Sequence, residues 1–191
     1  MDERRFFGVA LILAMLTGCG APDPFATPPP EPVSNPTDVT WNQEQKGLRT
    51  FIEAEKDLNT QRDVPLGLTI CVYQLKEYVA FQKLAATPSG IRSLLDCTLD
   101  TTGALSARSY AVQPGQHLEI SHDRMENARF LAVVAGFAHL KPEMCVAVQA
   151  FPLHKERQGL LRHTVYSATP IDVRIRLGAA SISLTGVERV R

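Results

Sequence analysis

The stretch ARFLAVVAGF, residues 128–137, has a single charged side chain, Arg129, in an otherwise apolar run. The polar break Lys141-Pro142-Glu143 follows shortly afterwards. A short apolar run bounded by polar segments is typical of a strand that is buried on both faces. We therefore predict a central strand at residues 128–137.

Several shorter strands are predicted on either side of this stretch. Apolar and polar residues alternate, with many β-branched and aromatic residues, in segments 47–55, 66–75, 107–112, 117–121, 145–151, 171–177 and 181–185. Such alternation predicts half-buried strands. The Pro114-Gly115 pair indicates a turn between two of them. About eight short strands predict an all-β fold, namely a β-sandwich.

Residues 76–86 and 89–96 depart from this alternation. Their apolar side chains recur every three or four residues, which is typical of helices with one buried face. Thr87-Pro88-Ser89 separates the two segments, and Ser89 is a candidate N-cap for the second. We therefore predict a short helical insertion between strands.

The N-terminus has the pattern of a lipoprotein signal. A charged start and an apolar run at 6–16 precede Leu16-Thr17-Gly18-Cys19, and this run is shorter than the roughly 20 residues of a membrane-spanning helix. The order resembles the bacterial lipobox, with residues 1–18 as signal peptide and Cys19 as the lipidated residue. A buried cysteine in a short helix is the alternative. Gly20, in place of an aspartate, favours the outer membrane.

Residues 19–39 contain seven prolines and few residues that could form a core. This composition predicts an extended, semi-rigid spacer between the lipid and the domain. A ligand for an aromatic groove is the alternative interpretation of such a segment. Residues 40–191 are long enough to form one domain with its own core.

Composition and motifs favour a binding protein over an enzyme. The formal net charge is zero and the charges are interspersed, so we expect no nucleic-acid partner. The sequence has no Gly-x-Ser-x-Gly, His-Glu-x-x-His, phosphate-loop or EF-hand motif, and its five histidines lack metal-ligand spacing. We predict no catalytic residues, no metal, no small-molecule substrate and no cofactor other than the covalent lipid on Cys19.

Three cysteines remain in the domain, Cys71, Cys97 and Cys145. They allow one disulfide in three ways. Cys71 and Cys145 each alternate with the neighbouring apolar residues of a predicted strand, which makes Cys71–Cys145 the first choice. The alternative is that all three are unpaired small hydrophobic residues.

Short motifs follow one another along the domain: Asp57-Leu58-Asn59, Pro65, ICVYQLK at 70–76, Gln113-Pro114-Gly115, ARFLAVVA at 128–135, and the pair 173–177 and 181–184. In this order they resemble motifs of the type VI secretion system outer-membrane lipoprotein family, TssJ (SciN). The chain departs from the family pattern at Cys71 and Cys145, which replace arginines. It also lacks the usual proline and glycine after Asn59.

The resemblance implies a transthyretin-like β-sandwich of two four-stranded sheets with a helical insertion. It also implies a lipoprotein held on the outer membrane, facing the periplasm, that binds the periplasmic C-terminal domain of TssM. In the family, the loop between the first two strands makes this contact. By position, this loop is Leu58, Asn59, Thr60, Gln61, Arg62, Asp63, Val64 and Pro65.

Within this loop, Asn59, Gln61, Arg62 and Asp63 are the expected exposed contacts. The alternative for the loop is a plain solvated connection between strands. For the whole protein, the alternatives are a periplasmic lipoprotein that binds a small ligand within the β-sandwich, and an envelope hydrolase with a non-standard site.

Overall fold

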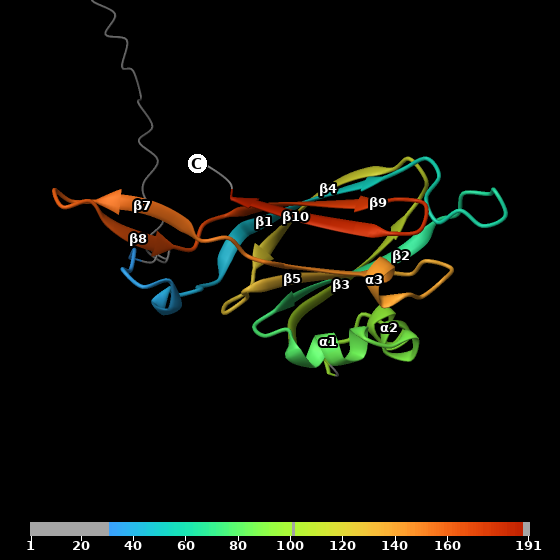
Figure 1. The fold of residues 1–191 in the computed structure, drawn as a ribbon, viewed down its shortest axis with the longest axis horizontal. Helices are drawn as coiled ribbons and strands as arrows, with labels where there is room; N and C mark the ends of the chain where they lie inside the picture. Colours follow the sequence, from blue (N-terminus) through green and yellow to red (C-terminus); the bar gives the residue numbers. More distant parts are fainter. Residues whose placement is uncertain (1–30, 101, 189–191) are drawn as a thin grey trace, which may run out of the picture.

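The computed structural model describes residues 31–100 and 102–188. The predicted signal peptide, Cys19 and the first part of the predicted spacer lie outside the described residues. Two four-stranded sheets stack face to face, and helices lie against the outer face of one of them (Figure 1). The prediction of a sandwich of two four-stranded sheets with a helical insertion is confirmed.

The first sheet has the strand order β10-β9-β1-β4. Its strands are β1 (Glu44–Ala54), β4 (His117–Arg124), β9 (Ile171–Leu177) and β10 (Ile182–Glu188). β1 runs parallel to β9, and the other neighbours are antiparallel. Alternate side chains of β1 and β9, such as Ile52 and Ile175, are fully buried, which explains the period of two in the sequence.

The second sheet is antiparallel and has the strand order β3-β2-β5-β6. Its strands are β2 (Leu68–Leu75), β3 (Ala104–Val112), β5 (Phe130–Ala135) and β6 (Val146–Ala150). β5 is the predicted central strand. Residues 131–135 of β5 are all fully buried, because the first sheet covers one face of this strand and the helices cover the other.

Apolar side chains from both sheets fill the space between them. Leu48 and Ile52 of the first sheet, and Leu131 and Val133 of the second, are at most 1% exposed. Interiors of this kind pack as densely as organic crystals. These inward positions therefore form a structural core.

The helical layer consists of α1 (Val79–Ala85) and α2 (Pro88–Leu95), with the single turn α3 (Pro142–Cys145) nearby. Figure 1 shows α1 and α2 beneath the second sheet. The hydroxyl of Tyr73, on β2, donates to the carbonyl of Leu94, and its ring meets the Phe81 ring edge-on at 5.5 Å. Burial raises the pKa of Tyr73 to about 12. The layer is thus part of the core.

The N-cap of α2 differs from the prediction. Thr87 caps the helix, and its hydroxyl accepts a hydrogen bond from the Gly90 amide at 3.1 Å. Ser89 lies inside the first turn, because Pro88 occupies the first helical position, where a missing amide costs nothing. At Gly90 an added Cβ would lie 1.9 Å from the Leu84 carbonyl oxygen, so only glycine permits this approach of α2 to α1.

The predicted Cys71–Cys145 disulfide is wrong, because Cys71 pairs with Cys97 across a Cα separation of 5.7 Å. Cys71 on β2 aligns with Val134 on β5, and Val134 aligns with Val146 on β6. Cys145 directly precedes β6, so it lies two strands away from Cys71. Two strand spacings exceed 9 Å, beyond the reach of a disulfide. Cys145 is instead free and buried. The sequence could not reveal that the face of β2 carrying Cys71 is covered by helices.

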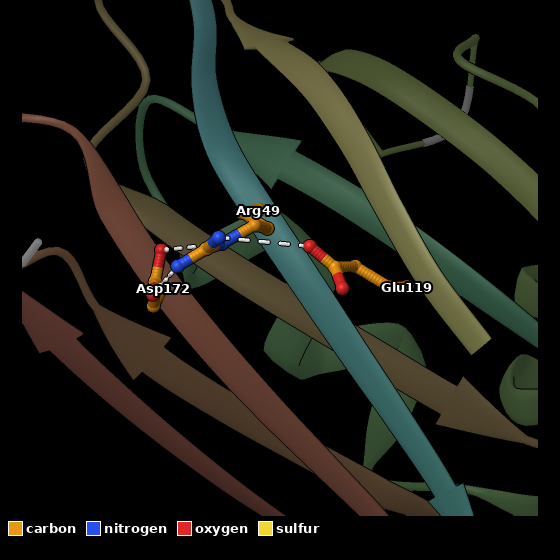
Figure 2. A network of polar contacts seen from close by, with 3 residues as sticks. All are labelled: Arg49, Glu119 and Asp172. Carbon is orange, nitrogen blue, oxygen red and sulfur yellow. Dashed lines mark hydrogen bonds and ion pairs between the residues drawn. The ribbon is translucent and has the colours of Figure 1, made fainter. Parts of the chain in front are cut away.

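The outer face of the first sheet carries charged side chains that pair across strands. The Arg49 guanidinium binds Asp172 through Nη2 at 2.5 Å and Nε at 3.2 Å, and its Nη1 lies 3.6 Å from Glu119 (Figure 2). The hydrogen bond to Asp172 is the main cause that raises the pKa of Arg49. Similarly, Glu53 pairs with Arg174 at 3.2 Å. Such ladders are typical of a solvated sheet face, and each exposed pair contributes little stability.

A two-stranded sheet, β7 (His154–Gln158) and β8 (His163–Ser167), projects from the sandwich (Figure 1). The 3₁₀ turn η1 (Pro36–Asp38) lies near its base. Sequence patterns did not predict this hairpin, because all five residues of β7 are polar and show no alternation. In the described ranges, no helix is long and apolar enough to cross a membrane.

Candidate functional site

The β1–β2 loop, residues 58–65, projects from one end of the sandwich, and the β7–β8 hairpin projects from the opposite end (Figure 1). The loop contains every residue that the sequence assigned to partner binding. Its structure divides them into a buried base and an exposed tip.

The tip is a miniature hairpin. Gln61 and Val64 exchange backbone hydrogen bonds, each 2.9 Å long. The two residues between them, Arg62 and Asp63, have φ values of 48° and 64°. Positive φ at both central positions is the signature of a type I′ turn, which favours asparagine and glycine. This chain therefore forms, with Arg-Asp, a turn that sequence patterns associate with Asn-Gly.

The base of the loop is fixed to the core by Leu58. Its side chain is fully buried. Its amide donates to the Glu55 carbonyl at 3.1 Å, and its carbonyl accepts from the Leu66 amide at 3.0 Å. These bonds close the loop at the point where it leaves the sheet. Leu58 is thus a support for the tip and presents no surface to a partner.

Asn59 was expected to be an exposed contact, and this expectation is wrong. It is only 6% exposed, because its amide group links two other segments. Its Oδ1 accepts from the Ala138 amide at 2.9 Å, and its Nδ2 donates to the Gly67 carbonyl at 3.4 Å. Its own amide donates to the Gly178 carbonyl. Asn59 therefore holds together the loop, the end of β5 and the β9–β10 turn.

The remaining residues of the loop, Thr60 to Pro65, are all exposed. Charged and apolar side chains lie next to one another on this surface, since Arg62 and Asp63 are followed by Val64, which is 54% exposed. Leu66, just outside the predicted range, is 39% exposed. A rigid surface that combines apolar area with charges suits contact with another protein.

A hollow of about 260 Å³ opens beside the base of the loop. It is lined by Asn59, Thr60, Phe137, Ala138, His139, Lys141, Met144, Ala179 and Ala180. These residues come from the loop, the segment between β5 and β6, and the β9–β10 turn. Sequence reasoning missed all but the first two, because only the fold brings the three segments together.

The described part of the chain has few side chains placed to bind a metal or to act as reactive groups. Within it, no group of three or more His, Cys, Asp or Glu side chains could hold a metal. His122 is only 7% exposed, and its Nε2 lies 3.2 Å from the Tyr110 hydroxyl. Burial lowers the pKa of His122. Burial also raises the pKa of the Cys145 thiol, which favours the unreactive neutral form.

Comparison with solved structures finds the same fold. The chain is similar to the type VI secretion lipoprotein TssJ1 from Pseudomonas aeruginosa, with 20% identity, a TM-score of 0.58, and 78% of this chain and 98% of that one covered. It is similar to Serratia marcescens Lip, a membrane-bound component of the type VI secretion system, with 15% identity, a TM-score of 0.55, and 72% and 96% covered.

A third similar chain belongs to a structure described as the type VI protein TssM C-terminal domain (869–1107) from EAEC, with 20% identity, a TM-score of 0.52, and 73% and 98% covered. Comparison with curated proteins finds no match. The family model for type VI secretion lipoproteins, described as VasD, EvfM and TssJ, matches residues 46–179. This match covers most of the domain, with every strand of the two large sheets except β10, and the chain therefore belongs to the type VI secretion lipoprotein family.

Proposed function

We propose that this lipoprotein is anchored in the outer membrane through Cys19 and binds the periplasmic C-terminal domain of TssM through its β1–β2 loop. In this role it tethers the envelope-spanning channel of the secretion system. The family match supports membership of the membrane complex, and the similar chain in a structure described by the TssM C-terminal domain supports the choice of partner.

The observation that carries this proposal is the rigid, exposed tip of the β1–β2 loop. Its backbone is closed by the Gln61–Val64 bonds, and its base is fixed by Leu58 and Asn59. A loop that is already ordered loses little conformational entropy on binding, so more of the contact energy appears as affinity. The exposed Arg62, Asp63 and Val64 supply the charge and the apolar area.

The arrangement of the chain is compatible with this division of roles. The described residues begin beside the β7–β8 hairpin, where Val33 pairs with Tyr166. The β1–β2 loop lies at the opposite end (Figure 1). A lipid on Cys19 would therefore hold the hairpin end toward the membrane and present the loop to the periplasm.

A small ligand bound between the sheets has less support. The inward side chains of both sheets pack against one another with almost no exposure. The hollow beside the loop opens at the surface, next to Thr60. That position suits a side chain of a protein partner as well as it suits a free ligand.

Binding to the periplasmic C-terminal domain of TssM tests the proposal. The mature chain, with Cys19→Ser so that it carries no lipid, is titrated by calorimetry. We expect micromolar or tighter binding, about −8 kcal/mol, which is lost when the tip charges are reversed by Arg62→Glu with Asp63→Lys.

The matched control is the pair Glu156→Lys with Arg157→Glu. It reverses two adjacent exposed charges on β7, at the other end of the molecule, and should leave the affinity unchanged. Equal losses in both variants would show a general charge effect and remove the loop from the proposal. The absence of binding by the folded unsubstituted domain would refute the adaptor function.

A further inference from the structure

The tip of the β7–β8 hairpin exposes two leucines to water. Leu160 is 101% exposed and Leu161 is 79% exposed, the highest values among the large apolar side chains of the described residues. The tip is a tight turn, in which the Arg162 amide donates to the Gly159 carbonyl at 3.1 Å and both residues have positive φ. The turn thus presents the two leucines together at the outermost point of the hairpin.

Cationic side chains flank these leucines. Residues 154–167 contain Lys155, Arg157 and Arg162 against one carboxylate, Glu156, which gives a formal net charge of +2. Lys155 and Arg157 lie on one face of β7, because alternate residues of a strand share a face. Lys155 lies over the ring of Tyr166, at 5.9 Å from its centroid. An apolar tip with a cationic collar is the composition of segments that lie in the interface of anionic membranes.

The hairpin also lies where the N-terminal segment joins the domain. Val33 and Tyr166 exchange backbone hydrogen bonds of 2.9 and 2.7 Å, which add Val33 to the edge of β8. Val33 follows Cys19 by 14 residues. At the rise of a polyproline II helix, roughly 3.1 Å per residue, 14 residues would span about 43 Å. A lipid on Cys19 therefore keeps the hairpin within reach of the same membrane.

We propose that Leu160 and Leu161 insert into the phospholipid surface that holds the lipidated Cys19, while Lys155, Arg157 and Arg162 bind its anionic headgroups. This inference rests on the proposed membrane anchoring. Two leucines and a net charge of +2 make a weak contact by themselves. The lipid anchor turns this contact into an intramolecular one at high effective concentration, and a second contact fixes the orientation of the domain.

The depth of a spin label in the membrane tests this inference. The mature lipidated protein is reconstituted in vesicles of phosphatidylethanolamine and phosphatidylglycerol, with a nitroxide attached at Leu160→Cys. The control site is Val64→Cys, also exposed and apolar but on the β1–β2 loop at the other end. The unsubstituted protein, whose free Cys145 is buried, gives the background of the labelling reaction.

We expect the label at residue 160 to collide mostly with oxygen, and the label at residue 64 mostly with a water-soluble nickel complex. In vesicles of phosphatidylcholine alone, the label at 160 should shift toward the nickel complex, since the anionic headgroups are gone. If the protein binds the vesicles that contain phosphatidylglycerol but the label at residue 160 remains exposed to water, the inference is overturned and the anchoring is left intact.

Two further outcomes are distinct. Protein that does not float with the vesicles at all would refute the lipid anchoring itself. A label at 160 that is shielded only at high protein density would indicate contact between copies of the chain and would also overturn the inference. Both substitutions are at exposed positions, and circular dichroism confirms that each variant is folded.

Discussion

The two ends of the sandwich each carry a hairpin, but only the β1–β2 loop contains buried residues of its own. The tip of the β1–β2 loop stands on Leu58 and Asn59, both buried, and the loop bonds to the end of β5 and to the β9–β10 turn. The β7–β8 hairpin extends away from the sandwich, and its apolar tip, Leu160 and Leu161, contacts water.

In the two proposed roles, one structural motif serves two kinds of contact. A protein partner has a fixed shape, and binding to it gains from a surface that is already ordered. A membrane surface is fluid and has no fixed shape, so an apolar tip flanked by cations is sufficient to bind it. If the two hairpins make these contacts, the β1–β2 loop should be the more rigid of the two.

The largest expected effect separates a buried leucine from an exposed one. Leu58→Ala leaves a cavity in a fully buried site and should lower the free energy of unfolding by about 2–5 kcal/mol. Leu160→Ala deletes the same atoms at a solvent-exposed position and should change the free energy of unfolding by about 0.5 kcal/mol or less. Urea denaturation of both variants measures this. Similar losses in the two would mean that the hairpin tips are equally supported.

Asn59→Ala should cost less than Leu58→Ala, about 1–3 kcal/mol. It leaves the Ala138 amide and the Gly67 carbonyl without their side-chain partner in a nearly buried site. Hydrogen exchange should show faster opening of the segments on both sides of the loop. Gln158→Ala at the far hairpin is the matched control, because it removes an exposed amide whose hydrogen bond, to Glu156, lies within β7. Slow exchange retained in Asn59→Ala would contradict the supporting role of this residue.

Sequence patterns predicted the parts of this molecule that depend on local periodicity. β5 was found from its unbroken apolar run and β9 from its alternation, because burial on two faces or on one leaves those signatures. The position of the loop followed from the family resemblance. What could not be predicted depends on which segments meet. From the sequence, Asn59 is an ordinary polar loop residue. Its buried role depends on hydrogen bonds with Ala138 and Gly178, which are distant in the sequence.

For the same reason, the burial of one arginine could not be predicted from the sequence. Arg124 is 1% exposed, with its Nη2 2.9 Å from Glu44 Oε2 and its guanidinium 5.1 Å from the centre of the Trp41 ring. Arginine is almost never fully buried unless it is paired, so composition alone places this residue at the surface. Only the pairing of β4 with β1 brings the carboxylate to it.

The turn of the β1–β2 loop gives a smaller effect, of opposite sign. Arg62 occupies a left-handed backbone conformation. This conformation costs most residues that have a Cβ roughly 1–2 kcal/mol, whereas asparagine adopts it more readily. Arg62→Asn should therefore raise the free energy of unfolding by up to about 1 kcal/mol while weakening binding to TssM. Arg157→Asn, in an ordinary strand of the other hairpin, should bring no gain. A loss of stability in Arg62→Asn would show that the arginine side chain makes a contact that offsets the strain.

The last prediction concerns the sheet between the two hairpins, where a single buried histidine responds to acid. Burial lowers the pKa of His122 from its usual value of 6.5, so the unfolded chain binds a proton more readily than the native one. Its contribution to stability is therefore complete above about pH 6.5 and declines as the pH falls through that value toward the lower native pKa. His122→Gln should flatten this decline in urea denaturation series between pH 7 and pH 5. Parallel curves for the two proteins would mean that other groups cause the loss of stability in acid. A flatter curve for His122→Gln would show that the acid-sensitive group lies in the sandwich and not in either hairpin, so that the two hairpins would differ in rigidity and not in their response to pH.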